Sequence, residues 1–376
     1  MLIYFLFILV YAVVNTACQS NSTKNGEILV LSGFNVSKRR TLFSILVFCG
    51  LLLLYGLRDS SVGVDISQYK YIYENAGGLL PGFWNFKGDF GYYYFNFFFF
   101  SRGVPWQIYL FLVYAIVSLA ITLFLHKYSD NVYFSLFLFI TIGFFTMSMS
   151  GLRQSLGVAL CLFSYILADS ANKKRKRIYK VFFLFLSLAF WFIAFTMHSS
   201  AFVFGVFYII RYFKIKRTWV LAGIIIVLLS FLYGGYLLNA FQWVFPERYK
   251  DYSITDAYNV HPLLIAVYVV FILFTCFAIP PTEAKKYYSK TDSLMFVFAL
   301  LNLLFLCLSI HNNQIGRLRF YFLMPATTMI SNALCKLKVK ERQLFYFVIT
   351  VSSLVFFWIV STGGTLQIDH YKFFFS

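Results

Sequence analysis

The sequence has little charge and few of the features on which soluble enzymes depend. Charged residues make up only 12% of its 376 residues, whereas a soluble domain carries about 25%. Its six cysteines include no CxxC pair, so neither a zinc site nor a disulfide framework is expected. Apolar residues, in contrast, reach 60%, with 49 Phe and 28 Tyr. These values exclude a soluble globule and indicate a protein that crosses a membrane several times.

Several catalytic signatures are also missing. The sequence contains no DxD pair, HExxH motif, GxSxG elbow or Walker loop, and we expect neither a metal ion nor a cofactor. The apolar stretches carry essentially no acidic residue at mid-membrane, where ion-coupled transporters and proton relays normally have some. An ion-driven pump is therefore disfavoured.

The apolar stretches predict an all-α polytopic membrane protein. In lipid each backbone polar group must be satisfied within its own segment, and the apolar/polar alternation of a barrel is absent. A helical span needs about 20 residues, and twelve stretches reach or nearly reach that length. We treat residues 1–376 as a single integral membrane domain with about 12 transmembrane helices. The predicted spans are 2–17, 41–57, 104–125, 131–149, 152–169, 179–196, 199–213, 218–239, 263–280, 292–310, 320–335 and 343–360.

The basic residues predict how these spans are oriented. Most of the 32 Lys and Arg residues, including the KKRKR run at 173–177, fall on one side of the topology. The positive-inside rule makes that side cytoplasmic, so both termini are predicted to be extracytoplasmic. The net charge of +18 is then a topology signal, and no nucleic-acid partner is expected. Two predicted outer loops, 58–103 and 240–262, are long enough to hold a site.

Arginine is the favoured basic residue on the predicted outer side. Its guanidinium group offers a planar fork of donors that matches phosphate oxygens, which lysine does not. Arg153 is the most informative case, because it lies between two apolar spans with almost no loop. It either anchors the chain at the interface or binds the phosphate of a lipid-linked substrate.

Two residues on the predicted outer side could act as a general base. His198 occupies a tight turn between the spans at 179–196 and 199–213, a position also typical of a hydrogen-bonded interfacial histidine. Asp65 lies in the first outer loop among hydroxyl groups and tyrosines, a composition that suits sugar recognition and equally a solvated loop. Residue type and position leave both interpretations open.

Five short motifs stand out along the chain. They are Val62-Gly63-Val64-Asp65-x-x-x-Tyr69, Gly88-Asp89-Phe90-Gly91-Tyr92, Gly151-Leu152-Arg153-Gln154-Ser155-Leu156, His198-Ser199-Ser200-Ala201 and Gly316-Arg317-Leu318-Arg319-Phe320-Tyr321. These motifs resemble those of the EpsG-like group of Wzy-type polysaccharide polymerases, and their order and rough spacing fit that group from about residue 40 to 335. Ser155-Leu156-Gly157 departs from the Ala-rich positions of the group, and this affects local helix packing but not the neighbouring arginine.

The resemblance implies a metal-independent glycosyltransferase of the bacterial inner membrane. Such an enzyme polymerises undecaprenyl-diphosphate-linked repeat units into O-antigen or capsular polysaccharide on the extracytoplasmic face. Its expected partners are the lipid-linked glycans, membrane lipid, a chain-length regulator protein and a flippase. Asp65 and His198 are then the candidate catalytic bases. The candidate diphosphate ligands are Arg58, Arg153, Arg317 and Arg319, and the candidate substrate-binding residues are Tyr69, Asp89, Gln154 and Tyr321.

Two other functions stay open on the sequence alone. A lipid-linked oligosaccharide flippase or other transporter needs a polar path through the bilayer and repeated halves, and neither is visible. An O-antigen ligase or another lipid-sugar glycosyltransferase shares the outer-face phosphate chemistry and differs from a polymerase only in its acceptor.

Overall fold

The computed structural model describes residues 1–19, 36–78, 89–142, 144–240, 262–281, 287–362 and 367–375. Over these ranges the chain is helical, and its strand-like pairings are two isolated bridges, Arg58 with Phe373 and Lys216 with Tyr287. The all-α class is therefore confirmed. The chain forms two compact units, Met1–Phe202 with Thr350–Ser376 and Val203–Ile349, and each is described by itself.

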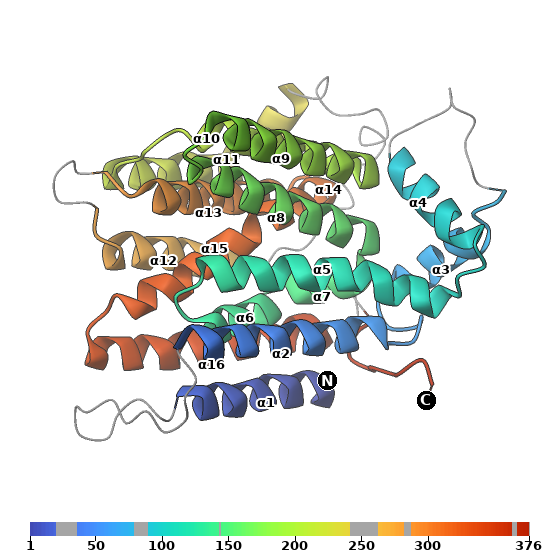
Figure 1. Ribbon diagram of the computed structural model, residues 1–376. Coiled ribbons are helices and arrows are strands. Elements are labelled where there is room, and N and C mark those ends of the chain that lie inside the picture. The colour runs from blue at the N-terminus through green and yellow to red at the C-terminus, as the bar shows by residue number, and fades with distance from the viewer. Residues whose placement is uncertain are drawn as a thin grey trace. The chain divides into compact units, whose positions relative to one another are not determined.

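The first unit is built on a stack of five long helices. α1 (Leu2–Gln19) packs on α2 (Val36–Gly56), α2 on α5 (Trp106–Tyr128), α5 on α8 (Leu152–Asn172), and α8 on α9 (Arg177–Met197) (Figure 1). Two short helices, α3 (Ile66–Glu74) and α4 (Phe90–Phe100), lie in the first predicted outer loop. α6 (Val132–Thr141) and α7 (Phe144–Ser150) join α5 to α8. The part of α16 (Val339–Thr362) from Thr350 onward also belongs to this unit.

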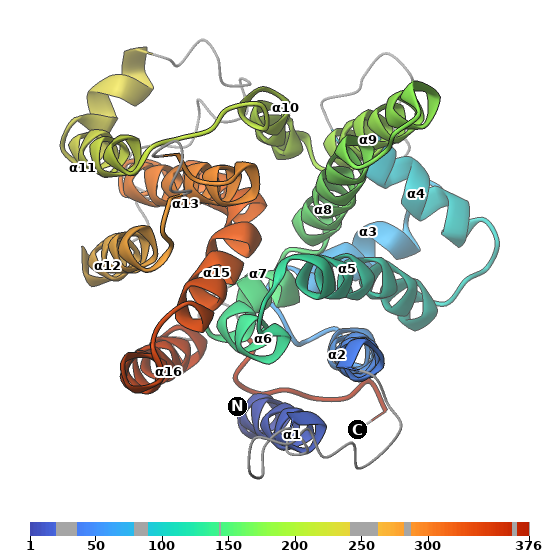
Figure 2. The same cartoon turned by 60° about the vertical axis from the view of Figure 1, so that its left-hand side comes forward.

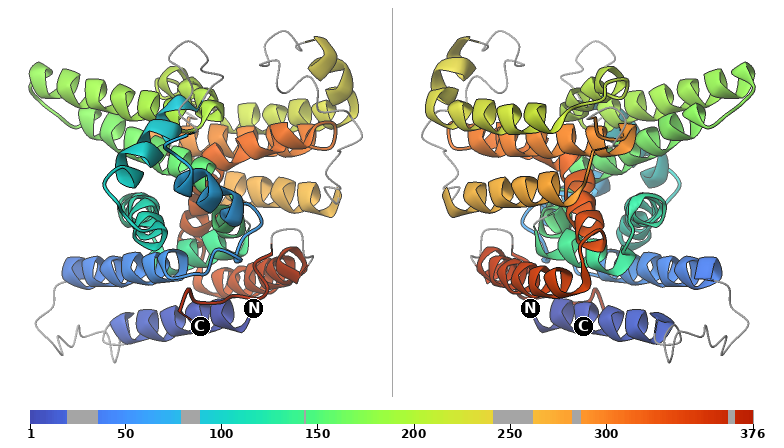
Figure 3. Two further views of the ribbon diagram at one scale, coloured as in Figure 1. Left: turned by 90° about the vertical axis from the view of Figure 1, so that its right-hand side faces the viewer. Right: turned by 90° about the vertical axis from the view of Figure 1, so that its left-hand side faces the viewer.

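The second unit is a bundle around α13 (Lys290–Leu308). α11 (Arg217–Ala240), α12 (Pro262–Ala278) and α15 (Phe320–Cys335) each pack against α13, as the two views of Figure 3 show. Ser289 caps α13, because its hydroxyl group accepts a hydrogen bond from Asp292 N (3.1 Å) and donates one to Asp292 Oδ2 (2.6 Å). The shorter elements are η1 (Ser199–Val206), which begins in the first unit, α10 (Phe207–Ile210), α14 (Asn313–Gly316) and η5 (Arg317–Arg319).

The number of spans differs from the prediction. Seven described helices are long and apolar enough to cross a membrane, and the bent pair α6 and α7 makes an eighth if it is one span. All twelve predicted stretches coincide with helical segments, but the count of about 12 is not confirmed. The stretch at 199–213 divides into η1 and α10, and that at 320–335 forms a helix of only 16 residues. The predicted outer loop at 240–262 lies, apart from its end residues, outside the described ranges.

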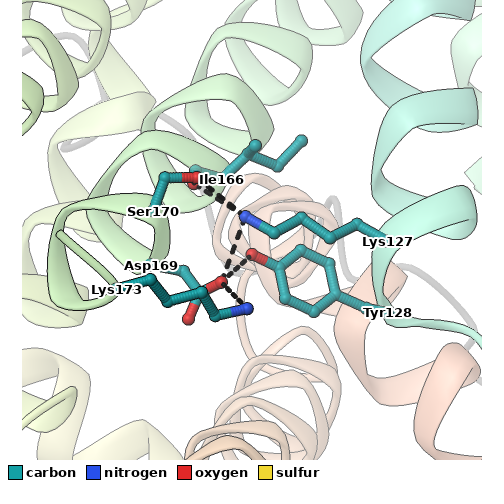
Figure 4. A network of polar contacts seen from close by, with 6 residues as sticks. All are labelled: Lys127, Tyr128, Ile166, Asp169, Ser170 and Lys173. Atoms are coloured by element: carbon teal, nitrogen blue, oxygen red, sulfur yellow. Dashed lines mark hydrogen bonds and ion pairs between the residues drawn. The ribbon is translucent and has the colours of Figure 1, made fainter.

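A polar network ties α5 and α8 together at one end of the first unit (Figure 4). The carboxylate of Asp169 lies 3.1 Å from Lys127 Nζ and 3.4 Å from Lys173 Nζ, and it accepts a hydrogen bond from Tyr128 OH (3.0 Å). Lys127 also donates to Ser170 Oγ (2.9 Å). The basic residues of this network lie at the ends that the sequence predicts to be cytoplasmic. A rise of about 1.5 Å per residue puts Asp169 roughly 26 Å along α8 from the opposite end at Leu152.

The C-terminal segment 367–375 runs along the loop that follows α2. Asp59 N donates a hydrogen bond to Lys372 O (2.9 Å), and Gly63 N donates one to Gln367 O (3.0 Å). Figure 2 shows this segment passing between α1 and α2. The backbone that leads from α2 to α3 is thus held by residues from the other end of the chain.

Candidate functional site

Asp89 is a buried carboxylate that contacts three groups from two distant parts of the chain. Its Oδ1 atom accepts a hydrogen bond from Ser199 N (2.5 Å). Its Oδ2 atom lies 3.1 Å from Arg153 Nη1 and 3.5 Å from His198 Nδ1. Only 3% of the Asp89 side chain is exposed. A buried carboxylate is stable as an anion when cations and hydrogen-bond donors surround it in this way.

Three helix ends bring these residues together. Asp89 directly precedes α4, Arg153 is the second residue of α8, and His198 directly follows α9. Because α8 and α9 are packed side by side and connected by a short turn, the start of one lies near the end of the other (Figure 2). This end of the two helices is opposite to the Asp169 network.

The backbone at Asp89 and Gly91 is specialised for this close packing. Asp89 adopts the left-handed conformation (φ 55°), which aspartate tolerates better than most residues with a side chain. A Cβ atom at Gly91 would lie 2.3 Å from Thr196 Oγ1 and 3.0 Å from the carbonyl carbon of Thr196. Glycine therefore lets the start of α4 touch the end of α9, and this contact places Asp89 beside His198.

The guanidinium group of Arg153 is enclosed by aromatic rings. Its Cζ atom lies 5.6 Å from the ring centres of both Tyr69 and Tyr92, within the range of cation–π attraction. The two rings contact each other edge to face, with centres 6.0 Å apart. The Nε–H of Arg153 is buried and has no hydrogen-bond partner in the described part of the chain. Asp89 and the two tyrosines thus hold the group in one orientation.

The environment of Asp89 favours its charged form. Burial by itself raises the pKa of this carboxyl, but hydrogen bonding and charge from His198, the backbone N–H of Ser199 and the Arg153 guanidinium lower it to about 2. Asp89 is consequently an anion at any physiological pH. An anionic carboxylate next to Nδ1 holds an imidazole ring in place and stabilises its protonated form.

Asp65, the other candidate base, has surroundings different from those of His198. Asp65 is partly exposed, directly precedes α3, and caps that helix without a side-chain hydrogen bond. Gly63, two residues earlier, has φ 98°, and a Cβ atom there would lie 2.2 Å from Met149 O. This glycine therefore allows the loop to approach the residues that lead into α8.

Arg58 links helices of the first unit through buried hydrogen bonds. It is completely buried and donates hydrogen bonds to Met149 O (2.5 Å) and Tyr114 OH (2.7 Å). Its Cζ atom lies 4.6 Å from the ring centre of Tyr114. These contacts connect the end of α2 to α5 and α7. Binding of a diphosphate by Arg58 remains a prediction, and the contacts seen in the structure are packing contacts.

The remaining predicted site residues lie in both units. Gln154 is buried on α8 next to Arg153 in the first unit. Arg317, Arg319 and Tyr321 belong to the second unit, where Arg317 is exposed and Tyr321 is buried. Within the first unit the structure thus brings Tyr69, Asp89, Arg153 and His198 into one cluster.

The structure adds one contact and one residue to the site predicted from the sequence. The sequence predicts Asp89 as a substrate-binding residue and does not indicate its position beside His198. Tyr92, which covers Arg153, was not among the predicted site residues. Both residues belong to the Gly88–Tyr92 motif, and this motif is the sequence feature that indicates them as site residues. Within the described ranges no group of three or more His, Cys, Asp or Glu residues could hold a metal ion.

These features define a multi-pass helical membrane protein in which Arg153 and His198 contact a buried Asp89 at one end of the packed helices. The chain belongs to the EpsG family, whose model matches residues 41–373. This is a family of Wzy-like, polymerase-type membrane proteins, generally associated with polysaccharide polymerase and glycosyl-transfer activity. No curated protein and no solved structure matches the chain.

Proposed function

We propose that the protein polymerises undecaprenyl-diphosphate-linked oligosaccharide repeat units into O-antigen or capsular polysaccharide. The reaction takes place at the extracytoplasmic face of the bacterial inner membrane. Membership of the EpsG family supports the reaction class, and the single observation that carries the proposal is the contact of Asp89 with both His198 and Arg153.

His198 acts as the general base in this proposal. A hydroxyl group of the incoming repeat unit must lose its proton when it attacks, and a histidine has a suitable proton affinity near neutral pH. Asp89 faces Nδ1 and would stabilise the imidazolium that forms. We favour His198 over Asp65 because His198 has a buried carboxylate partner, whereas Asp65 is partly exposed at the start of α3.

Arg153 stabilises the departing diphosphate. The growing glycan is attached through its anomeric carbon to the diphosphate of the polyprenol, and negative charge builds up on the diphosphate when that bond breaks. A guanidinium group already fixed by Asp89, Tyr69 and Tyr92 needs little reorganisation to meet this charge. A well-placed donor of this kind contributes about 3 kcal/mol to transition-state stabilisation.

The bonds and protons balance without a further reactant. The acceptor oxygen forms a bond to the anomeric carbon, the bond from that carbon to the diphosphate oxygen breaks, and the diphosphate leaves with the electron pair. The acceptor proton moves to Nε2 of His198, which then passes it to the departing diphosphate or to water, and release of undecaprenyl diphosphate completes the turnover.

Replacement of Arg153 by Ala tests the proposal. Cells with Arg153→Ala should make glycans of single repeat units, because the leaving group loses its donor, while the amount of protein in the membrane stays near normal. Arg153→Lys should restore only a small part of the long-chain glycan, since the charge is kept but the planar fork is lost. Glycan gels normalised to protein level measure both effects.

Arg102→Ala is the matched control. Arg102 also lies on the predicted outer side, but it is exposed and donates to Phe98 O of its own turn (2.7 Å). This variant should give a normal ladder of chain lengths. A normal ladder from Arg153→Ala at equal protein level would remove Arg153 from the mechanism.

A further inference from the structure

A run of five consecutive cations joins α8 to α9, at the end of these helices opposite the Asp89 cluster. α9 begins at Arg177, the last cation of the run, and residues 173–176 form the turn that leads into it. All five residues are exposed, as is Lys180 one turn further along α9. Because consecutive Cα atoms lie about 3.8 Å apart, the run occupies at most about 15 Å of chain.

The protein itself neutralises only one end of this run. The Asp169 carboxylate lies 3.4 Å from Lys173 Nζ, but it also lies 3.1 Å from Lys127 Nζ and so has two cations to balance (Figure 4). Lys174 Nζ lies 4.6 Å from the ring centre of Phe183. In the described part of the chain, the cations without an ion-pair partner are Lys174, Arg175, Lys176, Arg177 and Lys180.

Like charges at this spacing repel one another. The Debye length is about 8 Å at physiological ionic strength, so neighbouring cations of the run are screened only in part by dissolved ions. An anion bound among them removes this repulsion and gains charge-assisted hydrogen bonds from the guanidinium and ammonium groups. The run is therefore suited to bind anions at the protein surface.

The position of the run on α9 indicates which anions it meets. α9 is a candidate membrane span, and only 11% of its apolar window is buried within the protein. Ile178, Val181 and Phe182, which follow the run directly, are exposed apolar residues that lipid chains would cover. Tyr179 is also exposed, and tyrosine is typical of the headgroup level of a membrane. The cations thus lie beside the hydrocarbon boundary, where the phosphodiesters of lipid headgroups are the nearest anions.

We propose that Lys174–Arg177 and Lys180 form a binding site for anionic phospholipids on the side that the sequence predicts to be cytoplasmic. The headgroup phosphates accept hydrogen bonds from the cations, and the acyl chains lie along the exposed face of α9. Lipid is favoured over an acidic protein segment, because a soluble polyanion would have to displace headgroups that already adjoin this turn. The site lies away from the Asp89 cluster and does not depend on the proposed polymerase function.

Purified full-length protein tests the site in mixed micelles that contain equal parts of phosphatidylglycerol and phosphatidylcholine. Native mass spectrometry counts the lipids that stay bound. The unmodified chain should retain phosphatidylglycerol in preference to phosphatidylcholine, and the preference should fall as the salt concentration rises.

Neutral variants measure how much each cation contributes. Lys176→Gln should weaken the binding of phosphatidylglycerol about fivefold, the usual contribution of one Lys or Arg near an anionic membrane surface. The triple variant Arg175→Gln, Lys176→Gln, Arg177→Gln should weaken it about a hundredfold. If the triple variant does not insert into the membrane, the single variant and the salt dependence decide the outcome.

Two controls separate charge from fold. The double variant Arg175→Lys, Arg177→Lys keeps every charge and should bind phosphatidylglycerol normally. Lys127→Gln removes a cation that is already paired with Asp169 and donates to Ser170 Oγ (2.9 Å), so it should lower the thermal unfolding midpoint and leave lipid binding unchanged.

Three results would overturn the lipid site. They are equal retention of both lipids by the unmodified chain, unchanged binding by the neutral variants, and an equal loss of binding in Lys127→Gln and Lys176→Gln. The run would then only orient the helices, or bind an acidic protein segment.

Discussion

Asp89→Asn is the change that probes the candidate site most directly. It keeps the shape of the side chain and removes the charge that Arg153 and His198 face. The pKa of Asp89 falls from 3.8 to about 2 in the folded protein. Since one pKa unit corresponds to about 1.4 kcal/mol, the surroundings favour the charged form by roughly 2.5 kcal/mol. Because the carboxylate is almost fully buried, solvent screens little of this contribution.

The lowered pKa of Asp89 also makes the stability of the folded protein depend on pH. Because the pKa is lower in the folded state, Asp89 stabilises the fold fully above about pH 4 and loses this contribution as the pH falls from about 4 to about 2. The unmodified chain should thus unfold at a higher temperature than Asp89→Asn at pH 6, and the difference should shrink toward pH 2. Thermal unfolding in detergent at several pH values measures it.

The effect on activity should be larger than the effect on stability. Without the carboxylate, His198 loses the group that stabilises its protonated form, and we expect a loss of polymerisation of about a hundredfold or more. Asp169→Asn is the matched control, because Asp169 is also paired with two cations, at the opposite end of α8. That variant should lose stability but keep its activity per folded molecule. Full polymerisation by Asp89→Asn, or an equal activity loss in both variants, would refute the reasoning.

Two further substitutions test how the structure positions the site. Gly91→Ala should abolish long-chain glycans on gels while the protein remains in the membrane, because the new Cβ atom would lie 2.3 Å from Thr196 Oγ1 and separate Asp89 from His198. Partial recovery is expected in the Gly91→Ala, Thr196→Ala double variant, and full activity of the single variant would contradict the proposed close contact. Arg58→Met should lower the free energy of unfolding by about 1–3 kcal/mol, because Met149 O and Tyr114 OH lose their buried partner. An Arg58→Met protein of normal thermal stability that no longer bound undecaprenyl diphosphate would instead favour the ligand role predicted from the sequence.

The membrane class could be predicted because it depends on local properties of the chain. Every predicted apolar stretch coincides with helical structure, since a run of apolar residues in lipid has helix as its default. The number of spans was less predictable. Residues 199–213 are as apolar as other stretches, but they divide into η1 and α10, and hydropathy does not report where a helix breaks.

For the candidate site as well, individual residues could be predicted from the sequence, but the contacts between them could not. Motif or position indicated Arg153, His198 and Asp89 one by one, as a phosphate ligand, a base and a substrate-binding residue that act separately. Arg58 looked like Arg153 in the sequence, as a basic residue on the disfavoured side of the membrane. Only the packing shows that Arg58 is enclosed by Met149 and Tyr114.

Composition and charge placement alone determined that this chain is a helical membrane protein, and its short motifs identified the EpsG family. The tertiary structure decided that residues more than 100 positions apart, such as Asp89 and Ser199, share one cluster. The physical reason is that a run of apolar residues determines the local structure only over a few turns of helix. Contacts between distant residues depend on how helices pack and where glycines let them approach.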